Sequence, residues 1–287
     1  MASTSPSSQL RSTRLLTQQD KLARAHDEEV YPLFGQKLAD LLTMNLALLP
    51  RAHVLQIGCG LGDTTLQLLQ RMDAEARLIV VEATPALVER ARVAIDAESW
   101  GKRIFFRAHQ LEGKLPFAEN GFDHVLANMA LPELASPAAQ LAELVRVTKP
   151  GGQLRLATPL AGTWREFLDV YSDVLIRLRK HEMAEALDAY RTTFPEPEAL
   201  ATELEATGLG GVSVETVHWE LMFRTGREFF YAPVIELGPL PRWKAIAGKG
   251  SEMQDTFLAV KQAIDTYYGG TAFSVGVYAG VFSGTKT

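Results

Sequence analysis

Cysteine is almost absent from the sequence: Cys59 is the only one among 287 residues. A single cysteine excludes an internal disulfide framework and a zinc site built from several cysteines, and it fits a reducing compartment. The sequence also lacks an apolar run that approaches the roughly 20 residues of a membrane-spanning helix. We therefore expect a cytoplasmic protein that needs neither a membrane span nor a metal.

The chain also lacks a strong surplus of either charge. It contains 29 Lys and Arg against 34 Asp and Glu, a formal net charge of −5, and no block of basic residues. This composition argues against an electrostatic grip on nucleic acid or on an anionic membrane, and it favours a small-molecule partner. With 47% hydrophobic residues, a chain of this length can bury a large core without a metal or a disulfide.

The first residues are rich in Ser and Thr and carry Arg11 and Arg14. Transit peptides share this composition, but the segment has no long amphipathic pattern, so we interpret residues 1–17 as a disordered terminus. Residues 18–287 are then expected to form a single domain.

Short apolar runs alternate with helical repeats through most of the chain. Between Lys21 and Leu49 the repeat predicts two helices with a break near Tyr31 and Pro32. Strands alternating with helices predict an α/β fold with a mostly parallel sheet. The strands are expected at 54–57, 78–82, 104–108, 122–127, 153–157, 212–223 and 272–282, with a turn at 149–152 and an inserted helical cap over about 159–193.

A glycine-rich turn separates the first predicted strand from the helix that follows it. Gly58, Gly60 and Gly62 occupy alternate positions there, so that main chain can come within contact distance of a ligand. Glu82 ends the neighbouring strand, where a carboxylate can accept hydrogen bonds from both hydroxyls of a ribose. Together the turn and the acid indicate an adenosine-containing ligand.

The spacing of the glycines bears on which adenosine ligand is bound. A dinucleotide fingerprint read from Gly58 needs glycine at position 63, where this sequence has Asp63. A carboxylate at that helix start opposes a pyrophosphate, which disfavours a nicotinamide-dependent oxidoreductase. A cationic ligand without phosphate has no such conflict.

Four segments in this order resemble the class I S-adenosylmethionine-dependent methyltransferases, particularly those of ubiquinone and biotin biosynthesis. They read VLQIGCGLGD, LIVVEATP, KLPFAENGFDHVLANMALPEL and RVTKPGGQLRLATP, and they lie between Val54 and Pro159. The resemblance implies a Rossmann-like fold with a seven-stranded sheet and S-adenosyl-L-methionine as the cofactor.

The resemblance also implies roles for individual residues. The glycine turn would lie under the methionine portion of the cofactor, Glu82 would hold the ribose, and Ala83 would lie against the adenine. We expect Gln110 or Leu111 to lie near the adenine edge. We expect Asn128 and Met129 to face the methionine tail and the transferred methyl group.

The chain departs from the family pattern at two places. Gln56 replaces an acid that helps to hold the ligand's ammonium group; an amide carbonyl can still accept a hydrogen bond, but the charge is lost. After the third strand, the segment from His109 to Glu112 is longer than the usual pattern. These departures keep open a catalytically inactive S-adenosylmethionine-binding protein. A carboxyl methyltransferase acting on a carrier-protein thioester is a further alternative, although no basic docking face is evident.

The sequence does not assign a catalytic base. Glu133 is more readily interpreted as a surface acid, and His124 as a hydrogen-bonded core residue. His109 is the better candidate for a base, because it lies in a loop at the edge of the sheet where ligands bind. Trp164, Phe167 and Tyr171 form an aromatic stripe in the cap that is typical of core packing. The alternative is that one member lines an acceptor site, in which case the acceptor has an apolar or flat portion. We predict methyl transfer by in-line displacement to a small organic acceptor.

Overall fold

The computed structural model describes residues 26–83, 85–110, 113–128 and 136–287. The disorder that the sequence predicts for residues 1–17 lies outside these ranges.

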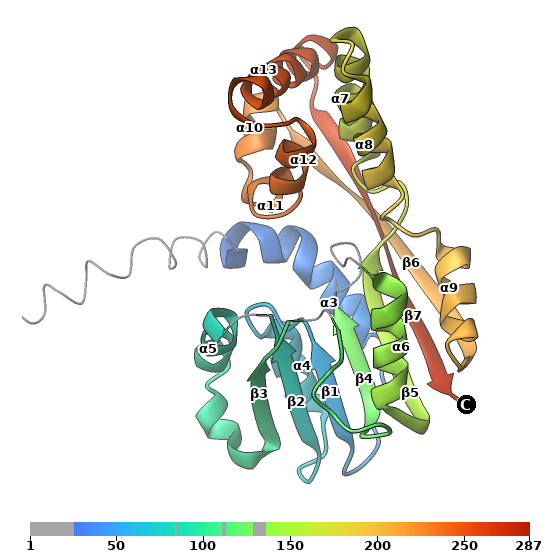
Figure 1. Cartoon of the computed structure of the whole chain (residues 1–287). Helices are drawn as coiled ribbons and strands as arrows, with labels where there is room; N and C mark the ends of the chain where they lie inside the picture. Colours follow the sequence, from blue (N-terminus) through green and yellow to red (C-terminus); the bar gives the residue numbers. More distant parts are fainter. Residues whose placement is uncertain (1–25, 84, 111–112, 129–135) are drawn as a thin grey trace, which may run out of the picture.

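A seven-stranded sheet forms the centre of the molecule, with the strand order β3-β2-β1-β4-β5-β7-β6 (Figure 1). Strands β1 to β5 are parallel, and β7 pairs antiparallel with both β5 and β6. The predicted mostly parallel, seven-stranded sheet is therefore confirmed. The strands are β1 (His53–Ile57), β2 (Arg77–Glu82), β3 (Ile104–Ala108), β4 (Phe122–Asn128), β5 (Thr148–Pro159), β6 (Leu209–Phe223) and β7 (Phe273–Lys286).

The central strands are buried on both faces, which explains why they read as continuous apolar runs. One face packs against α3 (Gln36–Thr43), α4 (Asp63–Arg71) and α5 (Pro85–Ala94), and the other against α6 (Pro137–Val147) and α9 (Pro197–Ala206). A short 3₁₀ segment, η2 (Ala97–Arg103), leads into β3. Successive side chains of β1 point to opposite faces of the sheet, since Val54 belongs to the core on the first face and Leu55 to the core on the second.

The turn predicted at residues 149–152 lies inside β5. This strand begins at Thr148, which pairs with Phe122, and the pairing resumes with His124 opposite Gln153. The register shift absorbs the residues between, so a bulge continues the strand where the sequence suggested a break.

The predicted helix break near Tyr31 and Pro32 is wrong. A π-helix, η1 (His26–Gly35), contains Pro32 and runs directly into α3, since Gly35 itself has right-handed helical angles. Proline lacks a backbone N–H, and the wider π-turn accommodates it without ending the helix.

The helical cap is built from two segments of the chain. Residues 159–193 contain α7 (Arg165–Arg177) and α8 (His181–Arg191), and the segment between β6 and β7 supplies α10 (Gly226–Tyr231), α11 (Pro233–Glu236), α12 (Leu240–Ile246) and α13 (Gly250–Tyr267). The two segments share one aromatic core, in which Phe167 lies 4.0 Å from Trp243 and 4.9 Å from Phe229 between ring centroids. We use "cap" for these six helices. In Figure 1 the cap stands above the sheet, and η1 lies between them.

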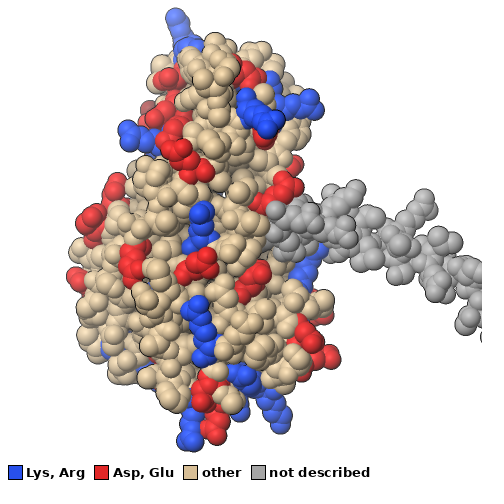
Figure 2. Space-filling view, turned by 180° about the vertical axis from the view of Figure 1, so that it is seen from behind, with Lys and Arg blue, Asp and Glu red and all other residues tan. Residues whose placement is uncertain are grey.

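Basic and acidic side chains are interspersed over the face shown in Figure 2, in keeping with the mixed composition of the chain. Among the residues that the structure describes, no helix combines the length and apolar character needed to cross a membrane.

Candidate functional site

The predicted ligand-binding residues come together at the carboxyl ends of β1, β2 and β4. The strand order reverses between β1 and β4, the position where open α/β sheets bind ligands. The glycine turn lies over this point: the N–H of Gly58 donates to the carbonyl of Val81 over 3.0 Å. A Cβ atom on Gly58 would lie 2.5 Å from the carbonyl oxygen of Asn128. The turn therefore fits between the ends of β2 and β4.

Glu82 holds the glycine turn in place. The residue is 7% exposed, and Oε2 accepts hydrogen bonds from the N–H groups of Cys59 (3.0 Å) and Gly60 (3.1 Å). Oε1 accepts from the N–H of Ala83 at 2.8 Å. Sequence reasoning expected this carboxylate to face a ribose and missed its bonds to the turn. Residue spacing could not have revealed them, because they depend on how the two strand ends meet.

The three glycines of the turn all have positive φ angles: 73° for Gly58, 53° for Gly60 and 102° for Gly62. A side chain is strained in this region whatever space surrounds it. A Cβ atom on Gly62 would in addition lie 2.7 Å from Cγ2 of Ile95, so the packing of α5 requires that glycine. Glycine is thus needed here by the fold itself, independently of any ligand.

Gln56 is completely buried beneath the turn. Its Oε1 accepts a 2.8 Å hydrogen bond from the hydroxyl of Thr65 in the first turn of α4. Its Nε2 has no hydrogen-bond partner within the described part of the chain. The carbonyl that the sequence assigned to a ligand ammonium group is thus occupied by Thr65, and the free group is a donor. Sequence reasoning did not single out Thr65.

Two further buried polar atoms at this edge lack a partner among the described residues: Oδ1 of Asn128 and Nε2 of His109. The N–H of His109 donates to the carbonyl of Glu82 at 2.9 Å, which holds this residue beside the end of β2. Gln110 follows it and is exposed. Leu111, Met129 and Glu133, which the sequence also singled out, lie outside the described residues.

Two other potentially reactive side chains, those of His124 and Cys59, have structural roles. His124 pairs with Val54 at the opposite end of β1, its Nε2 accepts from the N–H of Leu49, and burial lowers its pKa. Burial and the Glu82 carboxylate raise the pKa of the Cys59 thiol, which keeps it protonated. Neither is placed to act as a base or nucleophile.

The aromatic stripe of the cap is core packing. Trp164 is 4% exposed and Phe167 and Tyr171 are fully buried, and the hydroxyl of Tyr171 donates to the carbonyl of Trp243 at 3.1 Å. The ring of Trp164 stacks on Phe34 of η1 at 6.0 Å, so the stripe joins the cap to the N-terminal helix.

Comparison with known proteins finds similarity to methyltransferases over the segment that carries these residues. Residues 54–152 match the model of a methyltransferase domain. The chain is 28% identical over 170 residues to a demethylmenaquinone methyltransferase from Lactiplantibacillus plantarum, an alignment that covers 56% of this chain and 71% of that protein. It is 27% identical over 174 residues to the ubiquinone/menaquinone biosynthesis C-methyltransferase UbiE of Idiomarina loihiensis, covering 57% of this chain and 68% of that one.

The fold has known counterparts as well. The crystal structure of the YcgJ protein from Bacillus subtilis superposes with a TM-score of 0.58 at 19% identity, over 88% of this chain and 98% of that chain. This likeness concerns the fold and agrees with the strand order described above. The methyltransferase-domain match and the similarity to the named methyltransferases support a class I S-adenosylmethionine-dependent methyltransferase, with S-adenosyl-L-methionine as its cofactor.

Proposed function

We propose that this enzyme methylates a small organic acceptor with a flat, largely apolar ring. The relatives named above are described as methyltransferases for demethylmenaquinone and for ubiquinone and menaquinone biosynthesis. At the junction of η1, the cap and β6, Phe34 is buried against two other rings, with centroids 6.0 Å from Trp164 and 5.6 Å from Trp219. We place the flat acceptor beside this aromatic junction, whose apolar surroundings suit it better than a polar molecule.

The observation that carries the cofactor site is the set of buried polar atoms at the carboxyl edge. A carboxylate offers about four acceptor positions, and Glu82 uses three of them for backbone N–H groups. One position is left for a ribose hydroxyl. Nε2 of Gln56 and Oδ1 of Asn128 supply a donor and an acceptor, the pair that the carboxylate and ammonium groups of the methionine portion need.

S-adenosylmethionine, when bound, supplies an electrophilic methyl group carried on a sulfonium. The protein's contribution is to hold both molecules in line and to exclude water, which requires no proton transfer unless the acceptor must first lose a proton. In that case His109 is the candidate base, since it combines a position at the carboxyl edge with a buried, unpartnered Nε2 within the described chain. Gly58, Gly60, Gly62, Ala83 and Gln110 complete the proposed cofactor contacts.

Methyl transfer can be tested with S-adenosylmethionine labelled on its methyl group. We expect labelled product with a short-chain demethylnaphthoquinol and none with a carrier-protein thioester or a single-stranded RNA. Label on the thioester would favour the carboxyl methyltransferase alternative. Binding of S-adenosylmethionine without product from a panel of flat phenols and quinols would contradict the proposed acceptor class.

A further inference from the structure

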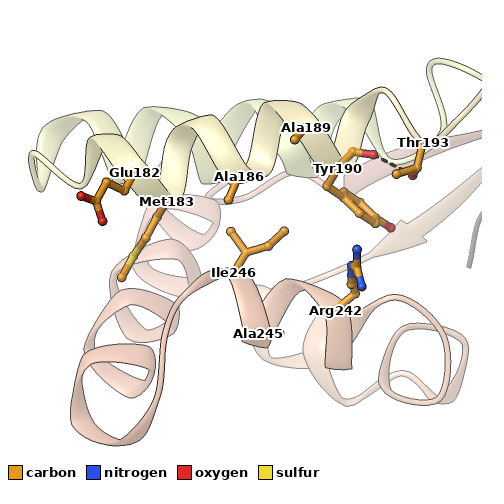
Figure 3. Close-up of a pocket in the computed structure, with 9 residues that line it drawn as sticks. All are labelled: Glu182, Met183, Ala186, Ala189, Tyr190, Thr193, Arg242, Ala245 and Ile246. Carbon is orange, nitrogen blue, oxygen red and sulfur yellow. Dashed lines mark hydrogen bonds between the residues drawn. The ribbon is translucent and has the colours of Figure 1, made fainter. Parts of the chain in front are cut away.

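A groove in the cap lies away from the proposed cofactor site. It has a volume of about 540 Å³ and runs between α8 and α12 (Figure 3). This volume is within the range of small-molecule sites. Both walls belong to the cap, whereas the glycine turn and Glu82 lie at the end of the parallel strands (Figure 1).

The two ends and the floor of the groove differ in character. Met183, Ala186 and Ile246 give it an apolar floor. At one end the guanidinium of Arg242 points into the groove, and the side chain of Tyr190 reaches down to the same end (Figure 3). Glu182 lies at the opposite end.

Arg242 is an exposed cation with no acidic partner among the described residues. Its side chain forms no ion pair or hydrogen bond with the described residues, in contrast to Arg191 nearby on α8, which pairs with Asp169 at 2.9 Å. A guanidinium carries five donors and no acceptor, and its planar fork fits a carboxylate in two parallel hydrogen bonds. The end of the groove at Arg242 can therefore bind a carboxylate group.

The far end of the groove restricts the ligand further. Met183 and Tyr190 are seven residues apart on α8, about 10 Å along the helix, which is room for an apolar tail of medium length. Because the Glu182 carboxylate stands beyond that tail, a second carboxylate on the ligand would meet a like charge. We propose that the groove binds a small monocarboxylate with an unbranched apolar tail, separately from the cofactor and the methyl acceptor.

Calorimetric titration of the 287-residue chain without S-adenosylmethionine tests the charge at each end of the ligand. Octanoate, 1-octanol and suberate share an eight-carbon chain but carry one, no and two carboxylates. We expect saturable binding of one octanoate per chain, with octanol and suberate at least tenfold weaker. Equal binding of octanol would overturn the role of Arg242, and equal binding of suberate would overturn that of Glu182.

Two variants on the same helix provide the matched control. Arg242→Met should weaken octanoate binding at least tenfold, whereas Lys244→Met should leave it unchanged, because Lys244 is exposed like Arg242 but does not line the groove. Octanoate that fails to saturate the wild-type chain, or binds the Arg242→Met variant equally well, would refute the site. Circular dichroism checks that both variants fold. Since the titration involves no methyl transfer, its result is independent of the proposed acceptor.

Discussion

At the scale of single residues, Glu82 connects the stability of the site to its proposed cofactor binding. The same carboxylate that is proposed to hold a ribose also takes three backbone N–H groups, from Cys59, Gly60 and Ala83. An ionised acceptor makes stronger hydrogen bonds than a neutral one. Loss of this charge should therefore affect both the empty protein and the loaded one.

We expect Glu82→Gln to lower the free energy of unfolding by about 1–3 kcal/mol, because an amide offers one oxygen and turns its N–H₂ group toward donors. The dissociation constant for S-adenosylmethionine should rise at least tenfold. Urea unfolding and calorimetry measure the two effects. Glu205→Gln, at an exposed position of α9, should change neither quantity. A variant that loses stability but keeps its cofactor affinity would limit Glu82 to a structural role.

At the scale of elements, two arginines fasten the end of α3, one to strand β5 and one to helix α4. The guanidinium of Arg155, 3% exposed on β5, donates to the carbonyls of Met44 (2.6 Å) and Leu41 (3.2 Å). Arg71 of α4 donates to the carbonyl of Thr43 at 2.6 Å. The last carbonyls of a helix lack partners within it and carry partial negative charge, so cations suit this end.

Arg155→Met should release this end of α3, because the methionine fills similar space but leaves two carbonyls without donors. We expect a loss of about 1–3 kcal/mol in unfolding free energy and faster amide hydrogen exchange in residues 36–46 than in the central strands. Mass spectrometry of exchanged peptides measures the latter. Arg92→Met, on the exposed side of α5, serves as the control. Unchanged exchange in α3 would show that packing alone holds the helix.

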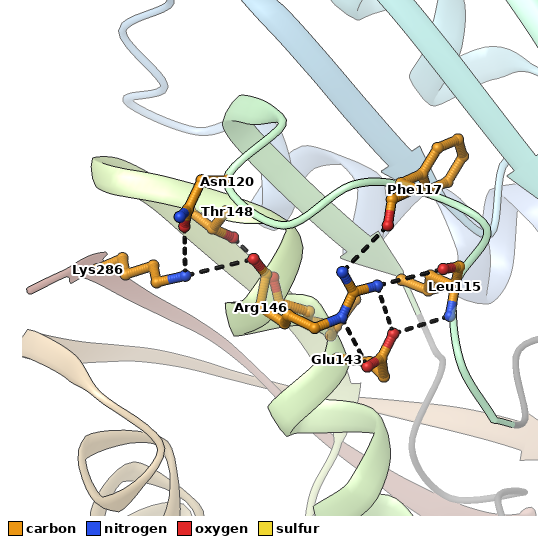
Figure 4. A network of polar contacts seen from close by, with 8 residues as sticks. Leu115, Phe117, Asn120, Glu143, Arg146, Thr148 and Lys286 are labelled. Carbon is orange, nitrogen blue, oxygen red and sulfur yellow. Dashed lines mark hydrogen bonds and ion pairs between the residues drawn. The ribbon is translucent and has the colours of Figure 1, made fainter.

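A second polar network fixes the loop that follows β3. Glu143 and Arg146 of α6 form a 2.8 Å ion pair, Glu143 accepts from the N–H of Leu115, and Arg146 donates to the carbonyls of Leu115 and Phe117 (Figure 4). The hydrogen bond from Arg146 lowers the pKa of Glu143 below its ordinary value of 4.5. Because the folded pKa is the lower one, the stabilisation is complete above about pH 5 and is lost as the pH falls through that folded pKa.

Glu143→Gln should accordingly cost about 1–2 kcal/mol at pH 7, where the wild-type carboxylate is charged. The difference between the two proteins should shrink as the pH falls from about 5 through the lowered folded pKa. Urea unfolding of both chains across this pH range measures it. A difference that stays constant with pH would mean that the charge of Glu143 contributes nothing.

The accuracy of the sequence reading varied between elements for physical reasons. The parallel strands were predicted within a few residues because burial on both faces leaves continuous apolar runs, as in β1 and β2. The prediction of a helix break at Pro32 was wrong because proline predicts the end of an α-helix, whereas the chain forms a π-helix there. The bonds of Glu82 to the turn join positions 22 and 23 residues apart, and no local pattern encodes them.

At the scale of the whole molecule, the N-terminal helices lie between the sheet and the cap. Phe34 of η1 is 6% exposed and contacts Trp164 and Trp219, while α3 packs on the sheet (Figure 1). The sequence placed only residues 159–193 in the cap. The helices between β6 and β7 begin at Gly226, 226 − 193 = 33 residues beyond that segment, and they complete the cap only through tertiary packing, which periodicity does not show.

In the proposed function the flat acceptor binds beside this junction, which the buried ring of Phe34 holds in place, apart from the residues proposed to hold the cofactor. Phe34→Leu keeps an apolar side chain of similar volume but removes the ring that stacks on Trp164. We expect a stability loss of about 1 kcal/mol, the size of an aromatic pair. The KM for the acceptor should rise at least fivefold while the KM for S-adenosylmethionine changes less than twofold.

Steady-state kinetics with each substrate varied in turn separates the two constants. Phe105→Leu is the matched control, since Phe105 lies on the edge strand β3 and is 51% exposed. It should leave both constants near their wild-type values. If Phe34→Leu raises the two KM values equally, the aromatic group supports the whole fold without selecting the acceptor, and the flat apolar ring loses its support from this molecule. If only the acceptor constant moves, the junction of η1 and the cap is where the acceptor is recognised.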